Sequence, residues 1–330
     1  MAPSNNPQPV LELRNVSVGY ESARGVVQAV RDISLTIYPN EIVGLIGESG
    51  SGKSTLANAI MHLLRNNAFL LGGEVLVQGQ NVYDLSHKAL KTFRWNRMSM
   101  VFQSAMNALN PVLTVEQQIA DVFEAHRPQM SKQEIHDKAV SLMELVSIHP
   151  KHLRSYPHEL SGGMRQRVVI AIAIALEPDL VIMDEPTTAL DVVVQKSILD
   201  KIRQLQKAKG FAVLFISHDF SLVAELAEKV AIMYAGRLVE VTDSKELNLE
   251  TRHHPYTHGL LRAIPELTAD SVTIEGIPGN PPDLIHLPSG CAYHPRCKYA
   301  MESCKTIAPV QNDVEGRQIA CHLYAEEAVK

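Results

Sequence analysis

A glycine-rich segment at residues 47–54 combines residue types and spacing that could bind a nucleotide phosphate. It reads GESGSGKS and fits the pattern G-x-x-x-x-G-K-[ST]. Glycines let such a loop wrap closely round phosphates, with backbone N–H groups pointing inward. Lys53 could reach the β- and γ-phosphates and Ser54 could ligate Mg²⁺. The strand-like EIVGLIG before the segment and the helical TLANAIMHLL after it favour this interpretation over a simple turn. The predicted phosphate contacts are Gly47, Glu48, Ser49, Gly50, Ser51, Gly52, Lys53, Ser54 and Thr55.

A pair of acidic residues follows about 130 residues later, in DLVIMDEP. Its apolar residues predict a buried strand that ends at Asp184, where a carboxylate could hold Mg²⁺ directly or through water. Glu185 would face the γ-phosphate, and a carboxylate there can polarise or deprotonate an attacking water. Alone, the pair would be better interpreted as a solvated acidic turn. Together with the phosphate loop, it predicts hydrolysis.

The elements that must position these residues alternate between strands and helices. Such alternation predicts an α/β fold with a mainly parallel sheet. The expected strands are 11–20, 34–38, 41–47, 74–77, 98–102, 179–183 and 212–216. Helical periodicity is expected at 55–64, through much of 107–155, and at 192–209, where Gly210 should end the helix. After about residue 240 the periodicity weakens and prolines, histidines and cysteines become frequent.

Composition excludes several classes of protein. Of the 330 residues, 45% are hydrophobic and 31 are basic against 36 acidic, a net charge of -5. A general nucleic-acid binder would usually carry a basic excess. The longest apolar run, VVIAIAIAL, is shorter than the roughly 18 residues that cross a bilayer. The N-terminus, MAPSNNPQPV, lacks the features of a secretory signal. We therefore expect a flexible tail at residues 1–9 of a cytoplasmic protein that reaches a membrane only through partners.

The segment LSGGM at residues 160–164, followed by RQR, resembles the signature loop of ABC ATPases. Ser161 can cap a helix start, and Gly162 and Gly163 allow close approach to a phosphate. Met164 departs from the commoner glutamine and resembles the variant of peptide-importer ATPases. Because the Ser-Gly-Gly part is intact, we expect anion binding to survive this departure.

Further motifs occur in the order that the ABC family shows, and the resemblance covers about residues 10–240. Gln103 in MVFQ matches the glutamine that senses Mg²⁺ and the attacking water. Asp191, in Ala189-Leu190-Asp191, matches the D-loop, and His218 in LFISHD matches the switch histidine. Tyr20 matches the aromatic residue that stacks on adenine, a contact of about 1–3 kcal/mol. The resemblance thus implies an ATPase with Glu185, His218 and Gln103 in catalysis, and with Mg²⁺ held by Ser54, Gln103 and Asp184.

The resemblance also implies an architecture. It predicts a P-loop NTPase ABC domain at residues 10–240, with a RecA-like core, an antiparallel β subdomain and a helical subdomain at about 104–160. Residues 241–330 would form a C-terminal extension. In the family two such domains pair head to tail, so that each ATP lies between one phosphate loop and the opposite signature loop. A second ATPase, expected to be a different but related chain, is therefore a predicted partner.

The C-terminal region indicates a narrower group within the ABC family. RHHPYTHGLLRAIP and GCAYHPRC resemble the tail of ATPases in dipeptide, oligopeptide and nickel importers. This implies a peripheral protein on the cytoplasmic face of the cell membrane, with two transmembrane permease subunits and an extracytoplasmic substrate-binding protein as partners. Short peptides are the first expectation for the cargo, and oligosaccharides or nickel are alternatives. A soluble ABC ATPase that acts on ribosomes or DNA fits the sequence less well. Ribosome-acting members usually carry two cassettes, whereas this sequence has one phosphate loop, and its excess of acidic residues argues against DNA binding.

Four cysteines occur in the last 40 residues, at Cys291, Cys297, Cys304 and Cys321. In a cytosolic chain such a cluster indicates metal more than disulfides. Four thiolates can hold Zn²⁺ or an iron–sulfur cluster, and the spacing leaves both open. The family resemblance favours a 4Fe–4S cluster, with Zn²⁺ or unliganded thiols as alternatives. Nearby histidines could be ligands, but we expect them to be surface or packing residues: His253, His254, His258 and His294.

Overall fold

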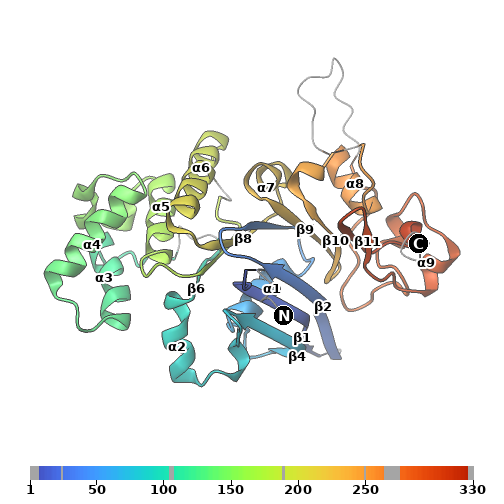
Figure 1. The fold of residues 1–330 in the computed structure, drawn as a ribbon, viewed down its shortest axis with the longest axis horizontal. Helices are drawn as coiled ribbons and strands as arrows, with labels where there is room; N and C mark the ends of the chain where they lie inside the picture. Colours follow the sequence, from blue (N-terminus) through green and yellow to red (C-terminus); the bar gives the residue numbers. More distant parts are fainter. Residues whose placement is uncertain are drawn as a thin grey trace, which may run out of the picture. The chain divides into compact units, whose positions relative to one another are not determined.

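The chain divides into two units in this computed structural model (Figure 1). The structure describes residues 7–23, 25–103, 108–187, 190–248, 250–263 and 276–325. The first unit comprises Met1–Glu12, Thr36–Glu41 and Leu76–Phe215. The second comprises Leu13–Leu35, Ile42–Val75 and Ile216–Lys330. Most of the tail expected at residues 1–9 lies outside the described residues.

Strands β6 (Met98–Val101), β7 (Leu180–Asp184) and β8 (Ala212–Ser217) carry the sheet of the first unit, with β7 in the middle. Strands β6 and β7 are parallel, with Ser99 opposite Val181. Every residue of the three strands is buried. Continuous apolar runs are typical of parallel strands that are covered on both faces. Asp184 is therefore the last residue of a central strand, as the sequence predicts.

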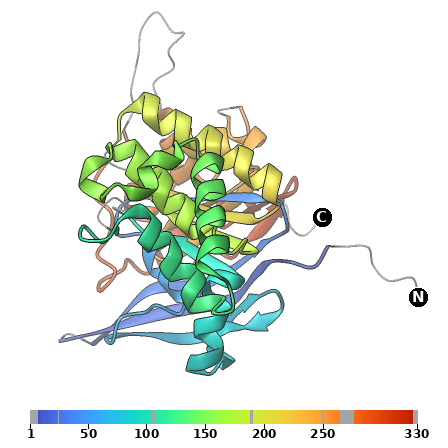
Figure 2. The ribbon, with the colours of Figure 1, turned by 90° about the vertical axis from the view of Figure 1, so that its left-hand side faces the viewer.

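Helices of the first unit start at strong caps. Thr114 and Ser131 each form a capping box with the residue three positions later, which satisfies two otherwise unpaired backbone N–H groups. The described α-helices of this unit are α2 (His87–Asn96), α3 (Val115–His126), α4 (Lys132–Leu145), α5 (Gly162–Ala173) and α6 (Val192–Lys209). Helices α3, α4 and α5 pack against one another, as Figure 2 shows in green. Gly210, with a positive φ of 80°, ends α6 as predicted.

The second unit contains a sheet in the order β11-β12-β10-β9-β3. Its strands are β3 (Ile42–Ile46), β9 (Lys229–Tyr234), β10 (Arg237–Asp243), β11 (Asn312–Val314) and β12 (Arg317–Ile319). Strands β3 and β9 are parallel, and the other pairs are antiparallel. Ile319 of β12 lies opposite Glu240 of β10. The last strands of the chain therefore extend the sheet that leads into the glycine-rich loop.

An antiparallel sheet in the order β2-β1-β4 also belongs mainly to the second unit (Figure 1). Its strands are β1 (Leu11–Ser22), β2 (Gly25–Ile37) and β4 (Ala68–Val77), and the two-residue β5 (Gln80–Asn81) of the first unit pairs with the end of β4. Strands β2 and β4 begin earlier than predicted. Their early residues are mostly exposed or half-buried, so they lack the apolar alternation that marks a strand in sequence.

Four described α-helices belong to the second unit: α1 (Lys53–Ile60), α7 (Phe220–Leu226), α8 (Pro255–Arg262) and α9 (Glu302–Thr306). Helix α1 is shorter at its end than the predicted 55–64. His62 has a positive φ of 52°, which a continuing α-helix of L-residues does not tolerate. Among the described residues, we find no helix with the length and apolar character needed to cross a membrane.

Candidate functional site

Lys53 is held over the glycine-rich loop. Its Nζ donates hydrogen bonds to the carbonyl oxygens of Gly47, at 2.7 Å, and Glu48, at 3.0 Å. Only 5% of Lys53 is exposed, and its ammonium also lies 3.5 Å from the Ser51 hydroxyl. The backbone N–H of Ser51 also donates to the Glu48 carbonyl, at 3.2 Å. The loop therefore presents a fixed positive charge at its centre.

Two glycines of the loop are required by its close packing. Gly52 has a φ of +104°, and a Cβ there would lie 2.3 Å from the carbonyl oxygen of Ala29. A Cβ on Gly47 would lie 2.2 Å from the carbonyl oxygen of Met233. Helix α1 begins directly after Gly52, and the N–H groups and dipole of a helix start favour a bound anion. The local structure matches the phosphate-binding role that the spacing predicts.

The other predicted ATP contacts of the second unit lie around the phosphate loop. Ser49, Gly50 and Ser54 are exposed and accessible to a ligand. Tyr20 of β1 is half-buried, and its hydroxyl lies 2.9 Å from the Thr55 hydroxyl. The structure thus brings Tyr20 together with the start of α1 within the second unit.

The acidic pair lies in the first unit, at the end of β7. Asp184 is buried, with 3% of its surface exposed. Glu185 follows with a positive φ of 47°, a left-handed conformation that is uncommon for a residue with a side chain and concentrates at functional sites. Nε2 of Gln103, two residues after β6, donates to Oε2 of Glu185 at 2.9 Å. The structure therefore joins two of the three predicted catalytic residues.

The signature serine caps a helix, as predicted. Ser161 is the N-cap of α5, and its hydroxyl accepts from the backbone N–H of Met164 at 3.3 Å. Gly162 and Gly163 form the first turn of this helix. Asp191 caps α6 in the same way and accepts from the Val194 N–H at 3.0 Å. Ala189 of the predicted D-loop lies outside the described residues.

The third predicted catalytic residue, His218, is exposed directly after β8. The next residue, Asp219, caps α7 by accepting from the N–H groups of Ser221 and Leu222. The histidine therefore stands at a strand-to-helix turn that its neighbours stabilise. Its contact with the γ-phosphate stays a prediction.

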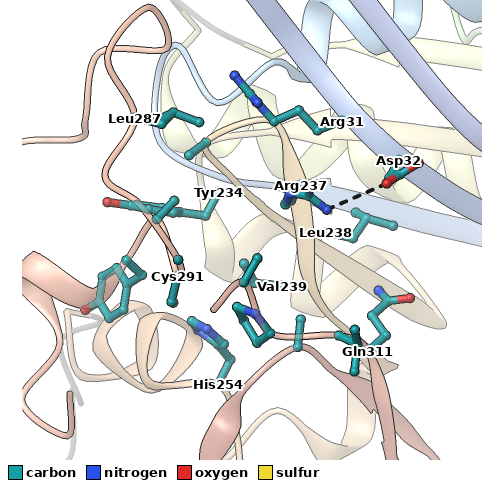
Figure 3. A pocket seen from close by; sticks show the side chains of 18 of the residues that line it. Arg31, Asp32, Tyr234, Arg237, Leu238, Val239, His254, Leu287, Cys291 and Gln311 are labelled. Carbon is teal, nitrogen blue, oxygen red and sulfur yellow. Dashed lines mark ion pairs between the residues drawn. The ribbon is translucent and has the colours of Figure 1, made fainter. Parts of the chain in front are cut away.

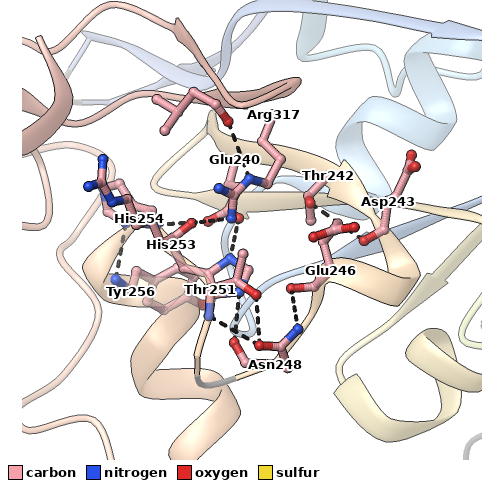
Figure 4. Close-up of polar contacts among 12 residues, drawn as sticks. Glu240, Thr242, Asp243, Glu246, Asn248, Thr251, His253, His254, Tyr256 and Arg317 are labelled. Carbon is pink, nitrogen blue, oxygen red and sulfur yellow. Dashed lines mark hydrogen bonds and ion pairs between the residues drawn. The ribbon is translucent and has the colours of Figure 1, made fainter. Parts of the chain in front are cut away.

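Two of the clustered histidines are packing residues, as expected. Nδ1 of His253 lies 2.6 Å from Oε1 of Glu240, and both side chains are fully buried. Oε2 of the same carboxylate accepts from the backbone N–H of His254 at 2.8 Å. His254 in turn caps α8, because its Nδ1 accepts from the Tyr256 N–H at 3.0 Å (Figure 4). Glu240 therefore connects strand β10 to the start of α8.

The buried cap makes stability depend on pH. Burial lowers the pKa of His254 from 6.5 to about 4, although the charge of Glu240 opposes this shift. The unfolded chain then binds a proton before the folded chain does. We expect the contribution of His254 to the free energy of unfolding to be constant above about pH 6.5 and to fall by up to about 3 kcal/mol between pH 6.5 and 4.

Urea unfolding of the full chain at pH 7 and pH 5 checks this expectation. The matched variant is His254→Asn, because asparagine is also a good N-cap and does not titrate. The loss of stability at pH 5 should be smaller in this variant than in the wild type. Equal losses in both proteins would show that His254 is not the responsible group.

The four cysteines lie in one neighbourhood. Cys304 and Cys321 are buried, and Cys291 and Cys297 are half-buried free thiols. Burial raises the pKa of Cys321 to about 12, and the charges of the other three thiols act in the same direction. Among the described residues, however, no three or more His, Cys, Asp or Glu side chains are grouped so that they could hold a metal ion. The structure thus does not support the predicted metal site.

The ring of His294 contacts the protein backbone. Its Nδ1 lies 2.9 Å from the carbonyl oxygen of Cys291. This contact occupies one ring nitrogen with a backbone oxygen.

A cavity of about 390 Å³ lies in the second unit (Figure 3). Arg237 at its wall pairs with Asp32 at 3.9 Å, and Tyr234 and Cys291 also line it. None of residues 47–55, all of which the structure describes, lines this cavity. It is therefore separate from the phosphate loop.

Comparisons with known proteins agree with this geometry. A family model described as "ABC transporter" matches residues 30–188, and one described as "Oligopeptide/dipeptide transporter, C-terminal region" matches residues 239–304. The dipeptide transport ATP-binding protein DppD of Caldanaerobacter subterraneus subsp. tengcongensis is 40% identical over 96% of this chain and 98% of its own length. The oligopeptide transport ATP-binding protein OppD of Salmonella typhimurium is 41% identical over 97% of this chain and 96% of its own. The chain belongs to the oligopeptide/dipeptide family of ABC transporter ATP-binding subunits.

Solved structures confirm the fold of this ABC ATPase subunit. The dimeric ATP-binding cassette MJ0796, in a post-hydrolysis state bound to ADP and Pi, has a TM-score of 0.64 and 28% identity. The match covers 71% of this chain and 98% of that cassette. The predicted family, P-loop ABC fold and ATPase activity are therefore confirmed.

Proposed function

We propose that this ABC ATPase hydrolyses ATP to drive the uptake of short peptides across the cytoplasmic membrane. The observation that carries this proposal is the near full-length similarity to subunits named for dipeptide and oligopeptide transport, which includes the C-terminal region. Oligosaccharides or nickel remain the alternative cargoes of the same machinery. A soluble ATPase acting on ribosomes or DNA would not need this C-terminal region.

We propose that ATP is bound by the phosphate loop. Lys53 would contact the β- and γ-phosphates, and Tyr20 would stack on adenine. Bound Mg²⁺ would neutralise phosphate charge, and its proposed ligands Ser54, Gln103 and Asp184 offer the oxygen atoms that this ion prefers. The buried ammonium of Lys53 and the glycines that closely pack the loop support this assignment.

Glu185 is the proposed general base for the attacking water, with Gln103 and His218 assisting. The hydrogen bond from Gln103 to Glu185 supports a shared role. A base that takes a proton from water must be held in place, and the amide of Gln103 orients one carboxylate oxygen. The other oxygen of the carboxylate is the proposed proton acceptor.

We propose that a second ATPase chain completes each ATP site. Ser161, Gly162, Gly163 and Met164 would contact the nucleotide of the partner, and Asp191 would lie at the same interface. Next to Asp191, Val192 and Val193 are 76% and 79% exposed. Two adjacent apolar side chains at a helix start support a surface that a partner covers.

The proposed assembly also includes two transmembrane permease subunits and an extracytoplasmic substrate-binding protein, with this chain peripheral on the cytoplasmic face. The proposed division is an ABC domain at residues 10–240, with its helical subdomain at about 104–160, and a C-terminal extension at 241–330. The separate family matches to residues 30–188 and 239–304 support this division.

The cargo is tested by the ATPase activity of the reconstituted transporter, with its binding protein loaded by defined ligands. Stimulation by short peptides, and not by oligosaccharides or nickel, is the expected result. Stimulation by an oligosaccharide alone would replace the cargo. Failure of every ligand to stimulate hydrolysis would contradict the importer assignment.

We also propose that the four cysteines hold a 4Fe–4S cluster rather than Zn²⁺. A tetrahedral Zn²⁺ needs four thiolates at about 2.3 Å from one ion, whereas a cluster binds each thiolate to a different iron and tolerates wider spacing. Backbone N–H groups of Tyr299 and Met301 point at the sulfurs of Cys297 and Cys304, at 3.4 and 3.5 Å. Such hydrogen bonds tune the potential of clusters, and they are equally compatible with thiolates that bind Zn²⁺.

Cys297→Ser is expected to remove most of the iron bound per chain. The measurement is iron, sulfide and zinc content of the full chain purified without oxygen, with wild type beside it. Zinc without iron in the wild type would favour the alternative ion. A wild type with neither metal, or a variant with unchanged iron, would contradict ligation by the four cysteines.

A further inference from the structure

The second residue of the phosphate loop, Glu48, is held by two residues that lie more than 200 positions later. The hydroxyl of Tyr256, in α8, accepts from the Glu48 backbone N–H at 3.0 Å. The guanidinium of Arg296 donates to both carboxylate oxygens of Glu48, at 2.7 and 3.0 Å. Such a bidentate salt bridge is strong and fixes the orientation of the two groups as well as their distance. The backbone and the side chain of Glu48 are therefore both tied to the C-terminal region.

Arg296 is itself built into the structure. Its Nε donates to the Pro278 carbonyl at 2.8 Å and its Nη2 to the Gly279 carbonyl at 3.2 Å. Its guanidinium carbon lies 5.9 Å from the ring centre of Tyr234 and 6.0 Å from that of Tyr293. Only 9% of Arg296 is exposed. An arginine with so many fixed partners has little freedom to release Glu48 by a change of rotamer.

Glu48 also positions the lysine of the loop. The Glu48 carbonyl accepts from Lys53 Nζ, and the Glu48 N–H is the group that Tyr256 binds. A shift of Glu48 would therefore move an oxygen on which the Lys53 ammonium rests. The influence of Arg296 and Tyr256 on Lys53 thus passes through Glu48.

The charge of Arg296 has a second effect. Glu48 carries a carboxylate within a loop that must accept the negative phosphates of ATP. Without a cation beside it, this carboxylate would repel the phosphates. The repulsion would be strong because the side chains are largely shielded from water, with 7% of the Arg296 side chain and 26% of the Glu48 side chain exposed. Arg296 thus neutralises the acidic residue of the loop.

We propose that Arg296 and Tyr256 are positioning residues for ATP: they hold and neutralise Glu48, and so set the phosphate affinity of the loop from the C-terminal region. This inference rests on the proposed binding of ATP by the loop. The competing explanation is that Arg296 only fastens the C-terminal segment to the rest of the second unit.

Arg296→Ala is expected to raise the dissociation constant of MgATP by about tenfold or more, because a hydrogen-bonded charge is lost. In the reconstituted transporter the KM for ATP should rise while kcat stays nearly unchanged, which is the mark of lost binding. Tyr256→Phe keeps the ring and removes the hydroxyl, so a smaller loss of about threefold is expected. The measurement is calorimetric titration of the full chain with MgATP.

The double variant Glu48→Gln with Arg296→Ala separates positioning from fastening. If Arg296 acts through Glu48, removing the carboxylate should recover much of the lost affinity. The matched control is Arg317→Ala, which removes another buried arginine of the C-terminal region. Arg317 donates to the carbonyls of Arg252 and Val314, which lie outside the phosphate loop. Its removal should leave the affinity for MgATP unchanged.

Three results would overturn the inference. Arg296→Ala and Tyr256→Phe could both bind MgATP as the wild type does. The double variant could recover none of the affinity, or Arg317→Ala could lose as much as Arg296→Ala. Failure of the wild type itself to bind MgATP would instead contradict the proposed function.

Discussion

Replacing Glu185 with glutamine should leave ATP binding intact and lower the rate of hydrolysis by at least about 100-fold, the lower end of what a general base contributes. Glutamine has the same shape but cannot accept a proton from water. Glu185 stands at the end of a buried strand with a positive φ of 47°, and Gln103 holds one of its oxygens at 2.9 Å. The variant should therefore keep the fold while losing the base. Phosphate release by the reconstituted transporter measures the rate, and titration with MgATP measures binding.

Glu177→Gln is the matched control for this experiment. Glu177 also has a positive φ, of 55°, but pairs with Lys209 on the surface at 2.6 Å. Hydrogen bonding to Lys209 lowers the pKa of Glu177, so its charge serves a surface ion pair. Hydrolysis by this variant should match that of the wild type. Near-normal turnover by Glu185→Gln would remove Glu185 from the role of base.

Replacing Lys53 with alanine should raise the dissociation constant of MgATP by about tenfold to a hundredfold, because a charged hydrogen bond contributes about 1.5–3 kcal/mol. The ammonium is buried and bound to two carbonyls of the loop. Its removal takes away the positive charge that the phosphates would meet. The rate of hydrolysis should fall by a larger factor than the affinity for MgATP, since the lysine also stabilises charge on the transferred phosphate.

The control for this variant is Lys207→Ala, on the exposed side of α6. It removes the same kind of charge far along the sequence from the loop, and it should not change the affinity. Thermal unfolding of both variants checks that the fold survives. Retained binding of MgATP by a folded Lys53→Ala protein would contradict the assignment of the loop.

Local pattern was sufficient for the strands and helices that position the phosphate loop and the acidic pair, but strands β9 and β10 were not predicted. The apolar run before Asp184, the strand before Gly47 and the amphipathic helix that ends at Gly210 all form as predicted. Each depends on neighbours within one element, where the periodicity of side chains reports burial. The prediction was poorer for β2 and β4, whose early residues are exposed, because hydrogen bonds to neighbouring strands leave no mark in hydrophobicity.

Motif spacing likewise located the proposed nucleotide-binding residues within the chain. The caps at Ser161 and Asp191 and the fixed Lys53 follow from local geometry that residue type dictates. His253 and His254 pack as expected. The metal ion site was not supported, because spacing along a chain cannot show how far apart folded thiols lie.

The sequence by itself thus determined the phosphate loop and the helix caps, since the hydrogen bonds of Lys53, Ser161 and Asp191 all lie within six residues. It located the acidic pair, but the hydrogen bond from Gln103 to Glu185 spans 82 positions and is seen only in the folded chain. The sequence does not indicate the hydrogen bonds between Glu48 and Tyr256, 208 positions apart, or between Glu48 and Arg296, 248 positions apart. Nor does it indicate that β12 pairs with β10, or that Glu240 meets His253 in a fully buried contact. These contacts arise only when folding brings distant segments together, because the free energy that selects them comes from mutual burial and not from any local preference of the chain.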